Sequence, residues 1–202
     1  MPKKTSDKIL DAGLKLFSEK GYLGATTKDI ARTAGVAELT LFRHFASKER
    51  LFEEVLKRHS FLPVLRELIP ELADLTYEEA LVRIAQKQLQ ALALRKGLIR
   101  IMHSEISRYP EKIREIYHAF IDEMISTLAA YFAGLVKKGL LREFDTARGA
   151  MAFFGMFFSY FNSQEFLMHR KAQAIDSDRV VREFVRIFVR GTISTGAAET
   201  EA

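Results

Sequence analysis

The sequence predicts an all-α protein. Apolar residues recur at helical spacing along almost the whole chain, Ser or Thr residues that can cap helices precede these stretches, and glycines follow them. At 202 residues, 48% of them hydrophobic, the chain can bury a full core. We therefore expect it to fold without disulfides or structural metal.

Composition also indicates where the protein works. The chain has no cysteine, which excludes disulfides, thiolate metal sites and cysteine nucleophiles and fits a reducing compartment. The N-terminal segment MPKKTSDKIL lacks the continuous apolar run of a signal sequence, and no run approaches the roughly 18 apolar residues that a membrane span needs. We expect a cytoplasmic protein with no membrane partner.

The net charge of +5 is concentrated near the N-terminus. Residues 1–60 carry 12 Lys and Arg against 8 Asp and Glu, whereas residues 61–202 carry 19 against 18. A local excess of positive charge indicates a polyanionic partner, which is either nucleic acid or an acidic membrane surface. Charge alone does not choose between these two, although Glu53 and Glu54 interrupt the best candidate for a basic membrane-surface helix.

The first 60 residues predict four short helices that pack as one head. Gly35 permits the positive φ of a sharp stop after the second helix, and the third begins within three residues. Ser47 can cap the fourth helix. The expected helices span residues 6–20, 26–34, 38–45 and 48–59.

A short helix, a glycine turn and a second short helix form the helix-turn-helix arrangement, whose second helix enters the major groove of DNA. Arg43 and His44 lie on this second helix. Lys48 begins the next helix, where free backbone N–H groups favour a phosphate. A run of charges alone is more often a solvated helix face, but the glycine turn between two short helices favours DNA binding.

The segment from Ile9 to Phe52 also resembles the DNA-binding region of the TetR family of transcriptional regulators, in order and spacing, over about a quarter of the chain. The resemblance implies a three-helix DNA-binding head at residues 1–47, a connecting helix at 48–62 and a helical effector-binding and dimerisation domain at 63–202. The matching positions are Ala12, Phe17, Gly21, Tyr22, Thr26, Thr27, Ile30, Ala31, Ala34, Gly35, Val36, Thr40, Leu41, His44, Phe45, Ser47, Lys48 and Leu51.

Site residues follow from the resemblance position by position. It implies that the DNA phosphates are contacted by Thr27, Thr40, His44 and Lys48, and it leaves as base readers Ala37, Glu38, Leu39 and Arg43. The family often has Ser, Gly and Tyr where this chain has Ala37, Leu39 and Phe42. Leu39 and Phe42 therefore either contact thymine methyl groups and sugars or are buried in the head, and burial is favoured for Phe42. Lys3 and Lys4 form either a DNA-contacting arm or a disordered tail, the default for a terminus.

The rest of the chain predicts a second set of helices. Pro63 and Pro70 indicate a broken helical connector, and Thr76 with Glu79 matches a capping box that begins a long helix. Two apolar helices follow near the C-terminus, at residues of about 145–168 and 177–195. The family builds its dimer interface there, which implies a homodimer, although ordinary core is the alternative for each aromatic. The interface residues would be Phe157, Phe161, Val181, Phe184, Val185 and Phe188.

An effector pocket in the family's usual place, among the middle helices, would be lined mainly by aromatic, aliphatic and thioether groups. Such a lining favours a small hydrophobic effector, such as a fatty-acyl compound or a hydrophobic toxicant, over a sugar or nucleotide. His103 is the candidate polar contact, and simple core filling is the alternative for every lining residue. The candidate lining is Leu92, Met102, His103, Ile106, Tyr109, Tyr117, Phe120, Met124, Phe154 and Phe158.

Catalytic and cofactor motifs are missing. The five histidines show no HExxH spacing, and the sequence has no Gly-rich phosphate loop, GxSxG elbow or DxDxDG loop. We expect neither an enzyme nor a bound metal or cofactor. The resemblance to the TetR family implies a dimeric transcriptional regulator, by default a repressor, that binds a near-palindromic double-stranded DNA operator and is released by its effector. The alternative is an all-helical protein-interaction module without sequence-specific DNA binding.

Overall fold

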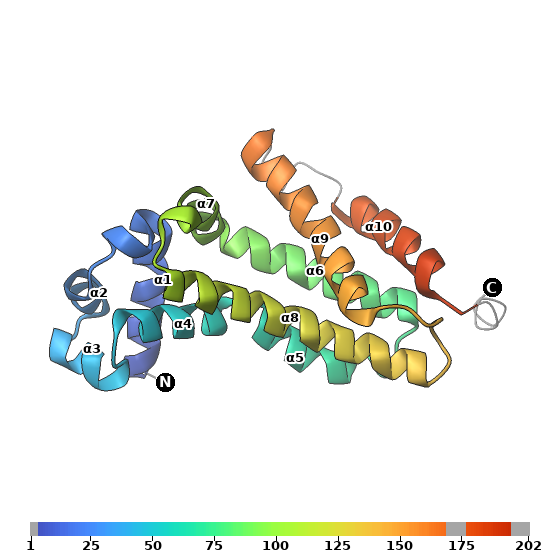
Figure 1. The fold of residues 1–202 in the computed structure, drawn as a ribbon, viewed down its shortest axis with the longest axis horizontal. Helices are drawn as coiled ribbons and strands as arrows, with labels where there is room; N and C mark the ends of the chain where they lie inside the picture. Colours follow the sequence, from blue (N-terminus) through green and yellow to red (C-terminus); the bar gives the residue numbers. More distant parts are fainter. Residues whose placement is uncertain (1–3, 169–176, 195–202) are drawn as a thin grey trace. The chain divides into compact units, whose positions relative to one another are not determined.

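The computed structural model describes residues 4–168 and 177–194, and these are helical almost throughout (Figure 1). The all-α prediction is confirmed. Of the two lysines considered for an N-terminal arm, Lys3 lies outside the described residues, and Lys4 is exposed directly before the first helix. Residue 195, the expected end of the last helix, also lies outside them.

The described chain divides into two compact units. The head unit contains the residues up to Ser60 together with Leu94–Ile121, and the body unit contains Phe61–Ala93 and the residues from Asp122 onward. This grouping differs from the expected boundaries at residues 47 and 62, which stay predictions. A segment from the middle of the chain therefore belongs to the same unit as the N-terminal helices.

Six helical segments and the start of a seventh build the head unit. The helix α1 is interrupted at Gly21, whose φ of 70° lies in the left-handed region, and helical residues continue to Gly24, beyond the expected end at residue 20. The segments are α1 (Thr5–Gly24), α2 (Thr27–Ala34), α3 (Glu38–His44), α4 (Lys48–His59), α7 (Lys96–Glu105), the 3₁₀ turn η1 (Ile106–Arg108) and the first part of α8 (Glu111–Lys137).

The core of the head unit lies between α1, α4 and α7. Phe17 and Phe52 are fully buried and meet edge to face, with their ring centroids 5.1 Å apart. Leu98 and Met102 of α7 are buried in the same cluster, as is Ile113 at the start of α8. The head therefore completes its core with residues about 80 positions further along the chain than Phe17.

Five helices and one π-helical turn build the body unit, and an aromatic cluster fills its centre. Phe132 is fully buried and stacks on Phe188 at 5.6 Å, and Phe153 meets Phe188 at 5.2 Å. The segments are α5 (Phe61–Glu71), α6 (Tyr77–Leu94), the remainder of α8, α9 (Thr146–Asn162), the π-helical turn η2 (Ser163–Leu167) and α10 (Ser177–Thr192).

Two predictions about helix boundaries in the body unit can be compared with the structure, and one of them is confirmed. The capping box is confirmed, because Thr76 N–H donates to Glu79 Oε2 at 2.9 Å and Glu79 N–H donates to Thr76 Oγ1 at 3.3 Å. The broken connector is wrong, because α5 is continuous through both prolines. Pro63 lies in its first turn, where a backbone N–H has no helical partner, and Pro70 lies one residue before its end.

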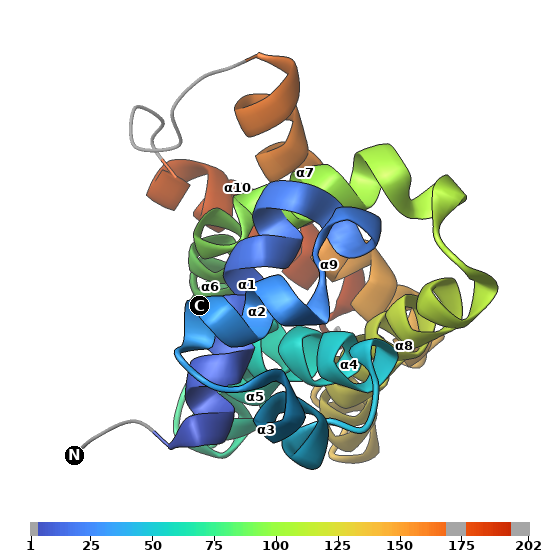
Figure 2. The same ribbon diagram turned by 90° about the vertical axis from the view of Figure 1, so that its left-hand side faces the viewer.

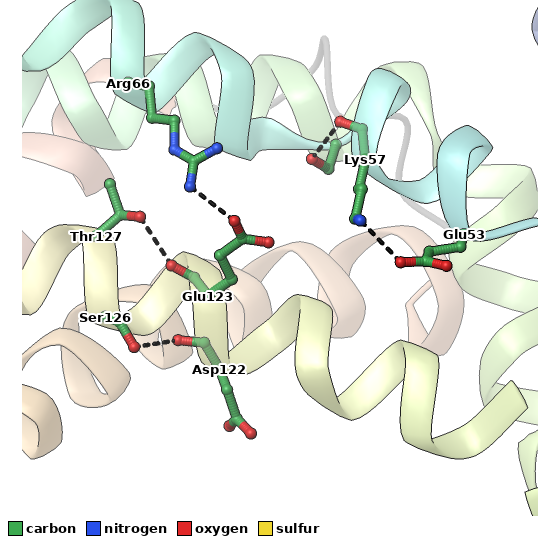
Figure 3. A network of polar contacts seen from close by, with 8 residues as sticks. Glu53, Lys57, Arg66, Asp122, Glu123, Ser126 and Thr127 are labelled. Atoms are coloured by element: carbon green, nitrogen blue, oxygen red, sulfur yellow. Dashed lines mark hydrogen bonds and ion pairs between the residues drawn. The ribbon is translucent and has the colours of Figure 1, made fainter. Parts of the chain in front are cut away.

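Ion pairs form between helices in the body unit and within a helix in the head unit (Figure 3). In the body unit, Arg66 of α5 reaches Glu123 of α8 at 2.7 Å. In the head unit, Lys57 pairs with Glu53 one turn earlier on α4 at 2.7 Å. Both pairs are partly exposed, so each contributes at most about 1 kcal/mol.

One helix in the described part of the chain, α8, is long and apolar enough to cross a membrane by length and composition. This finding corrects the expectation that no such run exists. The core helix of a soluble protein passes the same test, so it does not establish a membrane span.

Candidate DNA-binding interface

The turn between α2 and α3 is fixed by backbone hydrogen bonds. Gly35 adopts the left-handed conformation (φ 71°, ψ 35°), and its N–H donates to Arg32 O at 3.1 Å. Val36 N–H donates to Ala31 O at 3.0 Å, which completes the usual glycine C-cap. This turn holds α2 and α3 as two short helices beside α1 (Figures 1 and 2). The predicted helix-turn-helix geometry is present.

One face of α3 anchors the helix and the other is open. Leu41 is fully buried, and Phe45, just after the helix, is 8% exposed. Leu39 is 64% exposed and Phe42 is 42% exposed, so the expectation of a buried Phe42 is wrong. Because Leu41 and Phe45 lie one turn apart, they already supply the inward contact, and Phe42 is rotated by about 100° from Leu41.

Basic side chains lie on the same open face. Arg43 and His44 are exposed in the last turn of α3, and Ala37 is exposed directly before its first turn. Thr40 is half-buried. The recognition helix thus offers both apolar and basic groups to a partner.

The first turns of α2 and α3 are joined by their side chains. Thr27 Oγ1 donates a 2.6 Å hydrogen bond to Glu38 Oε1. Thr27 is a predicted phosphate contact and Glu38 a predicted base reader, and both are half-buried. Two residues with different predicted roles therefore form one hydrogen-bonded pair.

Lys48 is the first residue of α4, and Ser47 caps this helix by accepting a hydrogen bond from Arg50 N–H at 3.2 Å. The Lys48 ammonium lies 4.4 Å from the ring centroid of Tyr22, a cation–π distance. Burial lowers the pKa of Lys48, and the neighbouring Glu49 carboxylate opposes that shift.

Tyr22 is a residue whose role the sequence did not reveal. It matched the family pattern, but no function followed from that match. Its contact with Lys48 joins positions 26 residues apart, and no local spacing rule covers such a pair. The only sequence signal was an aromatic residue directly after the glycine that interrupts α1.

The ten residues of the predicted effector pocket fall into both units. Met102 and Tyr109 are each 2% exposed and belong to the core of the head unit, and His103 is exposed on α7. The shared pocket therefore stays a prediction. The head unit contains Met102, His103, Ile106, Tyr109, Tyr117 and Phe120, and the body unit contains Leu92, Met124, Phe154 and Phe158.

The body unit contains a buried polar group that the sequence analysis did not single out. Gln88 on α6 is 3% exposed, and its Nε2 donates to Phe154 O at 3.0 Å. Its Oε1 is buried and accepts no hydrogen bond from any described residue. An unsatisfied buried acceptor is uncommon and is a candidate contact for a ligand. The sequence did contain a sign of this group, because Gln88 lies on the same face of α6 as the buried residues Ile84, Ala85 and Ala91.

Most of the predicted dimer residues are buried within a single chain. Phe157, Phe161, Val181 and Val185 are at most 4% exposed, and Phe184 and Phe188 are half-buried against other aromatic rings. The outer faces of the same two helices carry Met151 on α9, 57% exposed, and Ile187 on α10, 60% exposed. A partner on these faces would meet Met151 and Ile187 first.

The tight glycine turn and the exposed face of α3 define a helix-turn-helix DNA-binding protein. Residues 9–55 match bacterial regulatory proteins of the TetR family, and residues 79–191 match the C-terminal domain of AefR-like transcriptional repressors. The chain belongs to the TetR family of transcriptional regulators and has an AefR-like C-terminal domain.

The similarity to known proteins extends over almost the whole chain. The uncharacterized HTH-type transcriptional regulator YvkB of Bacillus subtilis (strain 168) is 30% identical, over 93% of this chain and 96% of its own. A crystal structure from Mesorhizobium loti MAFF303099, described as a TetR-family regulator, is 26% identical with a TM-score of 0.76 and covers 94% of this chain and 96% of its own. FadR of Bacillus subtilis in complex with stearoyl-CoA shares the fold at 21% identity and a TM-score of 0.72, over 92% of this chain and 98% of FadR.

Family membership confirms the predicted class and the expectation that the protein is a regulator and not an enzyme. It argues against the alternative of a helical interaction module that does not bind DNA.

Proposed function

We propose that the protein is a dimeric repressor that binds a near-palindromic operator through α3 and is released by a small hydrophobic effector. The observation that carries the proposal is the open face of α3, where Arg43 and His44 lie beside the exposed Leu39 and Phe42 while Leu41 anchors the helix. The match to the C-terminal domain of AefR-like repressors supports repression, and not activation, as the effect of DNA binding on transcription.

Arg43 is our candidate for reading a base. A guanidinium can donate two parallel hydrogen bonds to O6 and N7 of guanine in the major groove. The exposed side chains of Leu39 and Phe42 suit thymine methyl groups and sugars. In this proposal Thr27, Thr40, His44 and Lys48 contact phosphates, which position the head without reading the sequence.

A homodimer would supply two heads. In helix-turn-helix dimers the two half-sites lie one helical turn of DNA apart, about 34–36 Å, or a multiple of it. The exposed Met151 and Ile187 support an interface on α9 and α10, the helices that the family resemblance implied. An isologous interface of this kind predicts a near-palindromic operator.

We place the effector in the body unit, beside Phe154 and Gln88. Phe61 and Phe154, with ring centroids 6.1 Å apart, provide an apolar environment, and Gln88 Oε1 provides a hydrogen-bond acceptor. Gln88 replaces the exposed His103 as the candidate orienting contact. The complex of FadR with stearoyl-CoA is consistent with a long acyl chain bound by this fold. The effector would then combine an apolar body with one hydrogen-bond donor.

Selection of DNA fragments by the full-length protein tests this function. Fragments of the host genome are captured with and without a panel of acyl-CoA compounds and of sugar phosphates. We expect a small set of near-palindromic fragments, released by one or more acyl compounds and not by sugar phosphates. Capture without sequence preference would contradict operator binding, and release only by a sugar phosphate would contradict the hydrophobic effector.

A further inference from the structure

The ring of Tyr22 is held firmly between the helices of the head unit. Tyr22 is 4% exposed and packs against three other rings, Phe17 at 6.0 Å, Phe52 at 5.3 Å and Tyr109 at 5.8 Å. Its free face lies under the Lys48 ammonium, 4.4 Å from the ring centroid. A rigid aromatic surface therefore supports the first side chain of α4.

The hydroxyl of Tyr22 holds the residue next to Lys48. Tyr22 Oη donates a 2.8 Å hydrogen bond to Glu49 Oε1. Hydrogen bonds from Ser47 and from backbone and Tyr22 donors hold the pKa of Glu49 below its usual range, so the carboxylate is charged at neutral pH. Without the Tyr22 hydroxyl this carboxylate could turn toward the Lys48 ammonium and neutralise it.

The backbone of Tyr22 is tied to the η1 turn. Tyr22 N–H donates to Tyr109 Oη at 3.0 Å, and Tyr109 Oη donates to Glu105 Oε2 at 3.2 Å. Gly21 suits this position, because its φ of 70° is one that other residues rarely adopt and because a Cβ atom there would lie 2.2 Å from Glu105 Oε2, which would have to move. Glu105, at the end of α7, and Tyr109, directly after η1, thus fix the Gly21–Tyr22 backbone through hydrogen bonds, although neither residue belongs to the first four helices.

These contacts bear on phosphate binding. A free lysine loses about 2 kcal/mol of side-chain entropy when it is fixed, so a lysine already held in place binds a phosphate at lower cost. A cation–π contact restrains the ammonium without neutralising its charge, whereas an ion pair with Glu49 would reduce its attraction for a phosphate.

We therefore propose that Tyr22 is a positioning residue for the Lys48 phosphate contact, and that Tyr109 and Glu105 hold Tyr22 in place. The inference rests on the proposed contact between Lys48 and a DNA phosphate. It assigns to Glu105 and Tyr109, at the end of α7 and directly after η1, a contribution to DNA affinity that needs no contact with DNA.

The test is a double-mutant cycle on the full-length protein. Binding to a random-sequence DNA duplex is measured over a range of salt concentrations for the wild type, Tyr22→Phe, Tyr109→Phe, Lys48→Met and both double variants with Lys48→Met. Random DNA makes the test independent of the operator. Tyr77→Phe is the matched control, because it removes a buried tyrosine hydroxyl, 3.0 Å from Thr192 Oγ1, in the body unit.

We expect Tyr22→Phe and Tyr109→Phe each to weaken binding about fivefold, the effect of one lost hydrogen bond, and to make the salt dependence less steep. In the Lys48→Met background, neither tyrosine substitution should alter the affinity or its salt dependence. Tyr77→Phe should leave both quantities unchanged in the wild-type background. Glu49→Gln provides a second cycle, since the loss caused by Tyr22→Phe should shrink when the competing carboxylate is absent.

Two results would overturn the proposal in different ways. If the tyrosine variants weaken binding equally with Lys48 and with Met at position 48, their effect is only structural, and the inference fails while the Lys48 contact stands. If Lys48→Met itself changes neither affinity nor salt dependence, the phosphate contact fails and the inference fails with it. Thermal unfolding of each variant identifies any that lose the fold. If Tyr22→Phe does, the cycle of Tyr109→Phe with Lys48→Met decides, and if Tyr109→Phe does, the two Tyr22→Phe cycles decide.

Discussion

Thr27 and Glu38 are joined by a 2.6 Å hydrogen bond that links the first turn of α2 to the first turn of α3. A DNA phosphate that accepted a hydrogen bond from the Thr27 hydroxyl would displace the Glu38 carboxylate. Glu38 would then need another donor, and the N4 amino group of cytosine supplies one in the major groove. On a sequence without such a donor, the carboxylate would stay unpaired beside phosphates.

Glu38→Ala should therefore bind random DNA more tightly, by about threefold, because a carboxylate that repels phosphates is removed. The ratio of operator affinity to random-DNA affinity should fall. Competition binding with both DNAs at one salt concentration measures this ratio. Glu78→Ala, which removes an exposed carboxylate from the first turn of α6, is the control. An unchanged ratio in Glu38→Ala would show that Glu38 does not contribute to discrimination.

Lys48→Ala should weaken binding to operator and random DNA alike. Loss of one phosphate contact lowers the magnitude of the slope of log K against log salt by about 0.9. Salt titrations on both DNAs give the two slopes. A loss confined to the operator would place Lys48 among the base readers instead.

Arg43→Ala should change sequence preference. Loss of a bidentate contact to guanine costs about 1–3 kcal/mol at one base pair and little elsewhere. The measurement is a ranking of single-substitution operator variants by affinity for the wild type and for Arg43→Ala. The same ranking for both proteins would exclude Arg43 as a base reader.

Ile187→Glu should dissociate the proposed dimer without unfolding the chain, because Ile187 is 60% exposed on α10. Phe184→Glu and Phe188→Glu are poorer tests, since both rings pack in the aromatic cluster of the body unit and a buried carboxylate there would destabilise the fold. Analytical ultracentrifugation at micromolar concentration reports the mass. A wild type that sediments as a folded monomer would contradict the dimer.

The stability of the head unit should depend on pH through His59. Burial lowers the pKa of His59, and Arg95 and Arg58 lower it further, while the Asp11 carboxylate, 3.6 Å from Nε2, raises it. The unfolded chain therefore takes up a proton near pH 6.5 that the folded chain takes up only at lower pH, so the free energy of unfolding falls as the pH is lowered through this window.

His59→Gln should flatten this dependence, measured by denaturant unfolding between pH 5 and pH 8, roughly the range in which histidines titrate. His118→Gln, which changes an exposed histidine on α8, is the control. An equal pH dependence in the wild type and in His59→Gln would assign it to other groups.

Local signals in the sequence predicted the elements of the fold. Gly35 and the Thr76–Glu79 capping box act through hydrogen bonds within a few residues, so their patterns could be recognised directly. Pro63 was misread, because a proline in a first turn is compatible with a helix and only the position of the helix start distinguishes the two cases.

Contacts between distant residues could not be predicted in this way. Burial was favoured for Phe42, but in this helix of seven residues packing against the other head helices buries Leu41 and leaves Phe42 42% exposed. The pair of Tyr22 and Lys48, and the burial of Tyr109 in the head unit, depend on tertiary packing. The family resemblance implied which residues contact DNA, whereas the contacts that Tyr22 and Tyr109 make could be seen only in the folded chain.

The most direct test of sequence-specific binding by a dimer is a footprint of the full-length protein on a selected genomic fragment. Two protected half-sites, with centres about 10–10.5 base pairs apart or at a multiple of that spacing, are the predicted result. Arg43→Ala should lose the footprint at a protein concentration at which it still binds random DNA. A single protected half-site, or protection spread evenly over the fragment, would contradict an operator read by two α3 helices.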